Sequence, residues 1–236
     1  MERHFHEELE KLNKNLLRMA ALTEKAIYDS VDALRTRNKD LALAVIEGDK
    51  EIDELENIVE EEAIELLALF QPMAKDLRLI TTAMRISVDI ERIADLTVNI
   101  CQRVLQIADA PLLKSLIDTP KLADNAKMMV KNAIDAFVNK DEELAKQVIL
   151  SDKESNRLRT VIVDKLINEY IIKDGTTAPR AVALLLVARD LERISDHATN
   201  IAEDVIYMIK AKVVKHHLDE LIFVYRKVRD DNKKSE

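Results

Sequence analysis

The segment DIERIADLTVNI, residues 89–100, returns 101 residues later as DLERISDHATNI, residues 190–201, and seven of the twelve positions are identical. A second pair of segments, residues 32–55 and 135–158, matches at ten of 24 positions with an offset of 103 residues. Both pairs occur in the same order, and their offsets differ by only two residues. We therefore infer that the chain is one unit duplicated, as in other proteins with internal repeats.

The composition favours helices and disfavours sheets. The chain has 236 residues, of which 47% are hydrophobic and 34% charged, but it contains only two glycines, four prolines and no tryptophan. Sheets, barrels, Rossmann domains and phosphate-binding glycine loops need more turn residues than this chain has. Apolar residues recur at spacings of three and four from Leu9 to Leu34, which predicts an amphipathic helix with one buried stripe.

Breaks in the apolar pattern divide each copy into three helices. In the first copy the pattern stops at residues 37–38, resumes from 39 to 69, and continues after Pro72 to residue 107. In the second copy we expect helices ending near residues 138 and 172, then a last helix reaching residue 210 or as far as Val228. Thr119, just before Pro120, is the expected cap of the fourth helix.

Long helices joined by short loops must lie antiparallel. The sequence therefore predicts an all-α fold: two tandem pseudo-symmetric three-helix bundles built from six long antiparallel helices. The predicted domains are residues 1–112 for the first bundle, 118–225 for the second, and 226–236 for a charged C-terminal tail.

Acidic residues are stacked one helical turn apart in both copies. Like charges at this spacing destabilise a helix by roughly 0.2–0.5 kcal/mol per pair, so facing rows of them suggest that a cation offsets the repulsion. Carboxylate oxygens suit hard cations, and the small residue before each aspartate would let two helices approach closely. The pairs are Asp49/Asp53, Glu91/Asp95, Asp152/Asn156 and Glu192/Asp196, and the small residues are Gly48, Ala94, Ser151 and Ser195.

A solvated helix face is the alternative interpretation of any one pair, because a third of the chain is charged. Arg92 and Arg193 also stand three residues before an aspartate, where an ordinary ion pair can form. The retention of the acids in both copies favours a metal site, but spacing and duplication alone leave both interpretations open. His197 follows Asp196, yet its counterpart is Leu96, so a site common to both copies cannot require it.

Other features limit the class of protein. No glutamate is followed by a histidine three residues later, so the ligand set of a di-iron enzyme is missing and we predict no catalytic residues. The net charge of −8 disfavours nucleic acid as a partner. A single cysteine, Cys101, fits a reducing compartment. No apolar run approaches the roughly 18 residues of a membrane span, so we expect a soluble, cytoplasmic protein.

Several of these motifs together resemble the PhoU family of bacterial and archaeal phosphate control. They are Gln71-Pro72-x-Ala74 followed by Asp76-Leu-Arg78, the two duplicated segments that begin at residues 89 and 190, and Asp49-x-x-x-Asp53. The likeness extends over about residues 5–212. In the second half Pro179-Arg180 stands without the Asp-Leu-Arg of the first half.

The resemblance implies a pair of three-helix bundles, usually dimeric, with multinuclear metal clusters on the acidic motifs. Iron is the expected metal, with zinc, manganese, magnesium and nickel as alternatives. Because Asn156 stands where the family often has an aspartate, and a neutral amide is the weaker ligand, the second cluster should bind metal less tightly. The implied ligands are Asp49, Asp53, Glu91 and Asp95 in one cluster, and Asp152, Asn156, Glu192 and Asp196 in the other.

The resemblance also implies a regulatory role without catalysis. Such a protein is an adaptor that couples the phosphate-specific ABC transporter, through its ATPase subunit, to a sensor histidine kinase. It restrains phosphate uptake and signalling, and it reaches the membrane only through these complexes. Two alternatives stay open from the residues themselves: a helical interaction module without metal, and a carboxylate-bridged metal enzyme.

Overall fold

The computed structural model describes residues 2–111, 113 and 118–211, and within these ranges the regular structure is helical throughout. The predicted all-α fold is confirmed, and helix boundaries fall within a few residues of the expected positions. The predicted tail and the extension of the last helix to Val228 lie outside the described residues. The long helices are α1 (Glu2–Thr36), α2 (Lys39–Phe70), α3 (Lys75–Ile107), α4 (Thr119–Asn139), α5 (Glu142–Lys165) and α6 (Ala178–Lys210).

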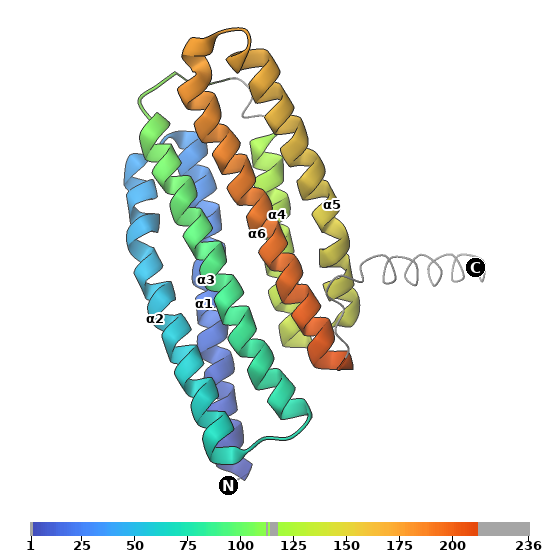
Figure 1. Ribbon diagram of the computed structural model, residues 1–236. Coiled ribbons are helices and arrows are strands. Elements are labelled where there is room, and N and C mark those ends of the chain that lie inside the picture. Colours follow the sequence, from blue (N-terminus) through green and yellow to red (C-terminus); the bar gives the residue numbers. More distant parts are fainter. Residues whose placement is uncertain (1, 112, 114–117, 212–236) are drawn as a thin grey trace, which may run out of the picture.

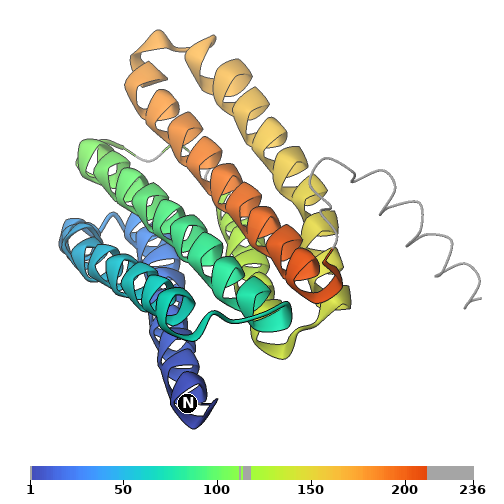
Figure 2. The ribbon, with the colours of Figure 1, turned by 60° about the horizontal axis from the view of Figure 1, so that its bottom comes forward.

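The six helices form two antiparallel three-helix bundles that stand side by side (Figure 1). Helices α1, α2 and α3 pack on one another in the first bundle, and α4, α5 and α6 do so in the second. Helices α3 and α6 also pack against each other and form the centre of the molecule, as the view from the lower end shows (Figure 2). The third helix of each copy therefore contributes both to its own core and to the junction between the bundles.

Equivalent side chains cap the second helix of each bundle. Asn38 precedes α2 in an extended conformation, and its side chain accepts a hydrogen bond from the backbone N–H of Leu41 at 3.0 Å. Asp141 precedes α5 and does the same for Leu144, also at 3.0 Å. Such caps satisfy N–H groups that have no partner within the helix. Their matching positions, 103 residues apart, carry the sequence duplication into the local structure.

The connection after the second helix differs between the copies. In the first bundle α2 continues to Phe70 as an α-helix, whereas in the second the chain leaves α5 through a π-helix (Leu166–Ile171) and a short 3₁₀ turn (Gly175–Thr177). The offset changes from 103 to 101 residues somewhere between residues 158 and 190, a range that includes this stretch. The expectation that Thr119 caps α4 was wrong: Thr119 is the first helical residue, and Asp118 before it makes no capping side-chain bond.

Ion pairs with exchanged charges join equivalent helix ends. In the first bundle Lys39 Nζ, at the start of α2, lies 2.6 Å from Asp109 Oδ2, just after α3. In the second, Glu142 Oε2 at the start of α5 lies 2.8 Å from Lys210 Nζ at the end of α6. The geometry of this contact is thus kept between the copies while the signs of the two charges are reversed.

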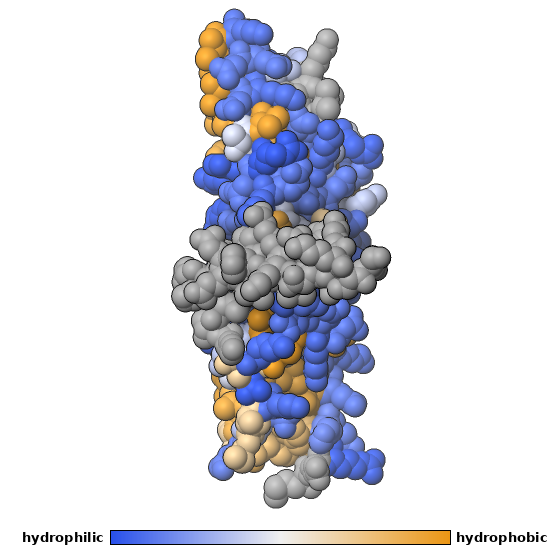
Figure 3. Space-filling model, turned by 90° about the vertical axis from the view of Figure 1, so that its right-hand side faces the viewer, coloured by the Kyte–Doolittle hydropathy of each residue, from blue (hydrophilic) through white to orange (hydrophobic). Residues whose placement is uncertain are grey.

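Most of the face that carries α5 is hydrophilic, with two apolar areas, one near its upper edge and one toward its lower end (Figure 3). Across the described ranges, every helix is too short or too polar to cross a membrane.

Candidate metal centres

Packing of α2 against α3 brings the first two acidic pairs together. Partial burial, together with the charges of Asp53 and Asp95, raises the pKa of Asp49 to about 6. On α3, partial burial and the charge of Asp95 raise the pKa of Glu91 to about 7, and Asp53 contributes from α2. Burial is the larger cause of both shifts, and the like charges add to it, as they do when carboxylates are close together and poorly solvated. Asp95 thus acts on Asp49, and Asp53 acts on Glu91, across the contact between the two helices.

Glu56 on α2 belongs to the same cluster, although the sequence analysis did not predict it. Partial burial raises its pKa, and Asp53, Glu60 and Asp95 add to this effect, while Arg92 opposes it. The sequence does contain the spacing that would identify it, since Glu56 follows Asp53 by three residues and shares its helix face. Its counterpart in the second copy is Arg159, so a search for acids retained in both copies passes over it.

Arg92 supplies positive charge beside the first cluster. Its Nε lies 3.4 Å from Glu91 Oε2 and its Nη1 lies 3.3 Å from Asp95 Oδ2. The i, i+3 ion pair that the sequence offered at this position is therefore formed. This half-exposed guanidinium contacts two carboxylates and opposes the rise in the pKa of Glu56, yet burial and the like charges still raise the pKa of Glu91.

The second cluster has the same frame and less negative charge. Asp152 on α5 is near Asp196 on α6: burial first, then Glu192 and Asp152, raise the pKa of Asp196 to about 6. Asn156 donates its Nδ2 to Asp152 Oδ2 at 2.8 Å. The Nε of Arg159 lies 4.0 Å from Glu192 Oε1, an ion-pair distance too long for a hydrogen bond. The structure thus assembles the four predicted residues and adds a cation among them.

Both clusters can be tested for their fit to a metal by their donor atoms. Carboxylate oxygens are hard ligands. Asp152 Oδ1 is buried without a hydrogen-bond partner, as expected of an oxygen that serves as a cation ligand. Within the described ranges, however, no three Asp, Glu, His or Cys side chains are arranged to hold a metal ion. The donor atoms of these residues are of the type that hard cations prefer, but their arrangement is not yet that of a metal site. To converge on one point, Glu91 and Asp95 would have to leave Arg92.

The core layer beneath the two clusters differs in polarity. In the second bundle Ser155 Oγ lies 2.6 Å from Ser195 Oγ and accepts a hydrogen bond from Asn125 Nδ2 at 2.8 Å. The counterparts in the first bundle are apolar: Leu22, Ile52 and Ala94. A buried polar layer is stable only when its groups bond one another, and here they do.

The expected role of the small residues holds only in part. Ala94 and Ser195 are buried, as contact between helices requires. Gly48 is exposed, and a Cβ added there would meet nothing within 4 Å. Close helix approach therefore does not explain this glycine, and the expectation for Gly48 was wrong.

The helices that carry the clusters are joined across the junction between the bundles. Asp89 on α3, two residues before Glu91, has its Oδ1 2.8 Å from His197 Nδ1 and accepts a hydrogen bond from Asn200 Nδ2 at 3.3 Å. His197 on α6 therefore pairs with an acid of the other bundle, which the sequence analysis did not foresee.

Comparison with known proteins also divides the chain into two copies of one unit. The family model described as PhoU domain matches this chain twice, at residues 16–104 and 119–205. A phosphate-specific transport system accessory protein PhoU homolog of Pseudomonas putida is 35% identical over 213 residues, covering 90% of this chain and 83% of that relative. The phosphate-specific transport system accessory protein PhoU of Escherichia coli K12 is 30% identical, covering 92% of each chain.

A solved structure agrees with these relatives. The crystal structure of PhoU from Pseudomonas aeruginosa superimposes with a TM-score of 0.85 at 34% identity, covering 88% of this chain and all of that one. The likeness therefore extends over both bundles and the junction between them.

Proposed function

The chain belongs to the PhoU family, and we propose that it is a metal-binding regulatory accessory protein of a phosphate-specific transport system. The names of its relatives describe accessory proteins of such a system, which supports a role beside the transporter rather than in catalysis. The missing Glu-x-x-His pairs point the same way, because they are the ligand set of bundle-type di-iron enzymes.

One observation supports the metal-binding part of the proposal: partial burial, and after it like charges on α2 and α3, raise the pKa values of Asp49 and Glu91. Holding these charges together is unfavourable in the metal-free protein, and a hard cation would turn the repulsion into attraction. The first cluster would bind through Asp49, Asp53, Glu91 and Asp95, and Glu56 would contribute further charge. The second would use Asp152, Asn156, Glu192 and Asp196, with lower affinity.

Bound metal would neutralise the carboxylates and fix α2 against α3, and α5 against α6. Iron is the first metal to test, followed by zinc, manganese, magnesium and nickel, in a multinuclear cluster. The protein's own contribution is the spacing of the acids along straight helices, which keeps the ligand positions of each bundle in register.

The regulatory part of the proposal is an adaptor role. The protein would couple the ATPase subunit of the transporter to a sensor histidine kinase in the cytoplasm, as a homodimer, and restrain phosphate uptake and signalling when phosphate is plentiful. Exposed apolar side chains around the turn between α2 and α3 support a docking role: Leu69 is 64% exposed, Met73 81% and Leu77 42%. Apolar side chains exposed together on a polar surface mark interaction sites.

The test combines metal content with regulation in cells that lack the native gene for this chain. Glu91→Gln with Asp95→Asn removes two charges from the first cluster. Glu47→Gln with Glu61→Gln, at exposed positions of α2, is the matched control for lost charge. We expect the control to bind metal and to restrain phosphate uptake in phosphate-rich medium, and the cluster variant to lose metal and leave uptake unrestrained. Normal regulation by a cluster variant without metal would favour the metal-free interaction module.

A further inference from the structure

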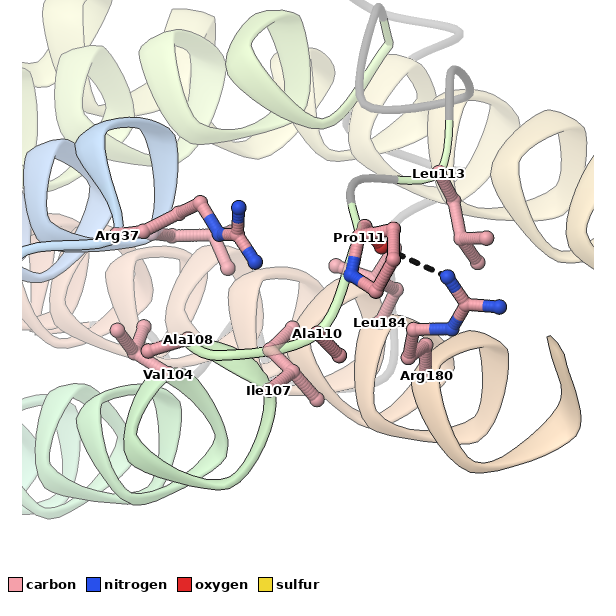
Figure 4. A pocket seen from close by; sticks show the side chains of 10 residues that line it. Arg37, Val104, Ile107, Ala108, Ala110, Pro111, Leu113, Arg180 and Leu184 are labelled. Atoms are coloured by element: carbon pink, nitrogen blue, oxygen red, sulfur yellow. Dashed lines mark hydrogen bonds between the residues drawn. The ribbon is translucent and has the colours of Figure 1, made fainter.

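The chain that leaves α3 is packed back over the upper end of the junction between α3 and α6. Leu113, six residues after α3, is only 6% exposed. Arg180, in the first turn of α6, donates its Nη1 to the carbonyl oxygen of Pro111 at 2.8 Å and so holds this part of the chain (Figure 4). Leu113 lines a narrow space together with buried apolar side chains of α1, α3 and α6: Leu34, Val104 and Leu184.

The lower end of the same junction has a similar arrangement up to the last described residue. Arg78, in the first turn of α3, donates its Nε to the carbonyl oxygen of Met208 near the end of α6, at 3.2 Å. The guanidinium of Arg85 also lies 5.7 Å from the centre of the Tyr207 ring, a cation–π distance. An arginine in the first turn of each third helix therefore holds the chain at or just after the end of the other third helix.

Helix α6 ends at this lower end of the junction. Ala211 adopts a φ of 55°, and its backbone N–H donates to the carbonyl oxygen of Tyr207 at 2.8 Å. A residue in the left-handed conformation ends a helix and redirects the chain, and residues other than glycine seldom adopt it. The chain therefore leaves the axis of α6 at Ala211, close to the start of α3.

Apolar side chains at the lower end of the junction are only partly buried. Leu79 on α3 and Ile209 on α6 are of intermediate exposure, and Val138 at the end of α4 is 47% exposed. The apolar area toward the lower end of the molecule in Figure 3 agrees with this. The described residues supply no equivalent of Leu113 at this end, so its apolar surface is without the cover that the upper end has.

The sequence after Ala211 has the pattern of a helix with one apolar face. Residues 212–229 contain five Lys or Arg and two acids. Because the whole chain has a net charge of −8, this segment is attracted to the rest of the molecule. Its apolar residues recur at spacings of three and four, and the first of them stands 101 residues after Leu113: Val214, Leu218, Leu221, Ile222, Tyr225 and Val228.

We propose that residues 212–229 pack their apolar face on the lower end of the junction, as the counterpart of the cover that Leu113 forms at the upper end. The surface they cover is formed by Leu79, Val138 and Ile209. The segment then lies beside the turn between α2 and α3, and a partner that docks on this turn has to displace it. That consequence rests on the proposed function, whereas the contact itself does not.

Methyl NMR of the full chain tests the contact directly. We expect NOEs from the methyl groups of Leu218 and Leu221 to those of Leu79 and Val138. In a mixture of isotope-labelled and unlabelled chains, these NOEs should arise within one chain. Their absence, or their appearance only between two chains, would overturn the proposal. Binding of the segment to phosphatidylglycerol vesicles, with none of these NOEs in the free protein, would identify a membrane as its partner and also overturn it.

Limited proteolysis measures how often the segment leaves the surface. Leu221→Asp, in the apolar face, should increase the rate of trypsin cleavage within residues 212–229 about tenfold, because burial of the leucine is lost and cleavage follows the population of the open form. Phe223→Asp is the matched control, since helical spacing places this residue on the other side of the segment. Equal cleavage rates of the two variants would contradict the packing of this face on the protein.

The receiving surface is tested by the same measurement. Val138→Asp should also speed cleavage of residues 212–229. Val182→Asp is its control, because Val182 is equally exposed, at 46%, but lies near the start of α6 at the other end of the molecule. An equal effect of Val182→Asp would overturn the assignment of the lower end. Both experiments use the isolated protein, so a failure of the proposed regulatory role would leave their outcome unchanged.

Discussion

The two acidic clusters show how far two copies of one sequence can diverge within a common frame. Both set i, i+4 acids on packed helices, and both raise the pKa of a carboxyl to about 6 or more. In the second copy, however, an amide replaces Asp53 and an arginine replaces Glu56. The polar layer of Asn125, Ser155 and Ser195 replaces an apolar one. The helical frame is thus kept by packing, whereas the charge at the site has been free to change.

The largest expected effect is on metal affinity. Glu91→Gln with Asp95→Asn should weaken metal binding to the first cluster by at least about 100-fold, because ligand changes exceed the 10–100-fold effects of their outer partners. Glu192→Gln with Asp196→Asn, the matched change in the second cluster, should lower the total amount of bound metal by less. Elemental analysis after loading and dialysis measures both, and equal losses would contradict the asymmetry.

The next largest effect is on stability. It is measured with substitutions that give one cluster the charges of the other. Asn156→Asp with Arg159→Glu gives the second cluster the charges of the first, and should destabilise the metal-free protein by about 1–3 kcal/mol through partly buried like charges. The reciprocal Asp53→Asn with Glu56→Arg should stabilise it. Urea unfolding with chelator, and again with metal, measures both changes. A conversion that neither destabilises the apo-protein nor increases metal binding would show that these positions do not set the difference.

The pH dependence follows from the direction of the pKa shifts. Glu91, with a pKa of about 7, and Asp49, at about 6, bind protons more tightly in the folded chain than in the unfolded one, so the unfolding free energy decreases as pH rises from about 4.5 to 7. With solvent screening the loss is on the order of 1 kcal/mol. Unfolding of the metal-free protein at pH 5.5 and pH 8 measures it, and Glu91→Gln should reduce the difference. A metal-free protein that is more stable at pH 8 would refute this explanation.

The smallest effect concerns the polar layer of the second bundle. Ser155→Ala removes the hydroxyl that joins Asn125 to Ser195, and should cost about 1 kcal/mol, mainly from the polar groups left without a partner. Replacing the whole layer by Leu, Ile and Ala, as in the first bundle, should recover most of this loss. Both can be followed by chemical denaturation. A triple variant far less stable than Ser155→Ala would mean that the second bundle packs differently from the first.

The fold was predictable from the sequence because local and global signals agree. The duplication, the scarcity of turn residues and the breaks near residues 37 and 140 specify six helices, and short loops then specify their directions. The π-helix at Leu166–Ile171 and the uncapped start at Thr119 were missed. They occur where the copies differ in length or where the chain joins the bundles, and neither leaves a periodic signal.

The predicted ligand positions were brought together, but their surroundings were not predictable by the same method. Comparing the two copies selects what they share, so it hides Glu56, Arg159 and the pairing of Asp89 with His197. Each of these exists in one copy or between the copies.

The exchanged ion pairs at the helix ends have a consequence for how the chain avoids self-mispairing during folding. If α2 docked on α6, Lys39 would meet Lys210, and if α5 docked on α3, Glu142 would meet Asp109. Each pair contributes under about 1 kcal/mol at these surface positions. Even so, like charges would repel in both wrong assemblies, whereas opposite charges attract in both correct ones. Tandem repeats are prone to misassembly between copies. The reversed order of charges at the helix ends therefore favours pairing within each bundle over pairing between the bundles.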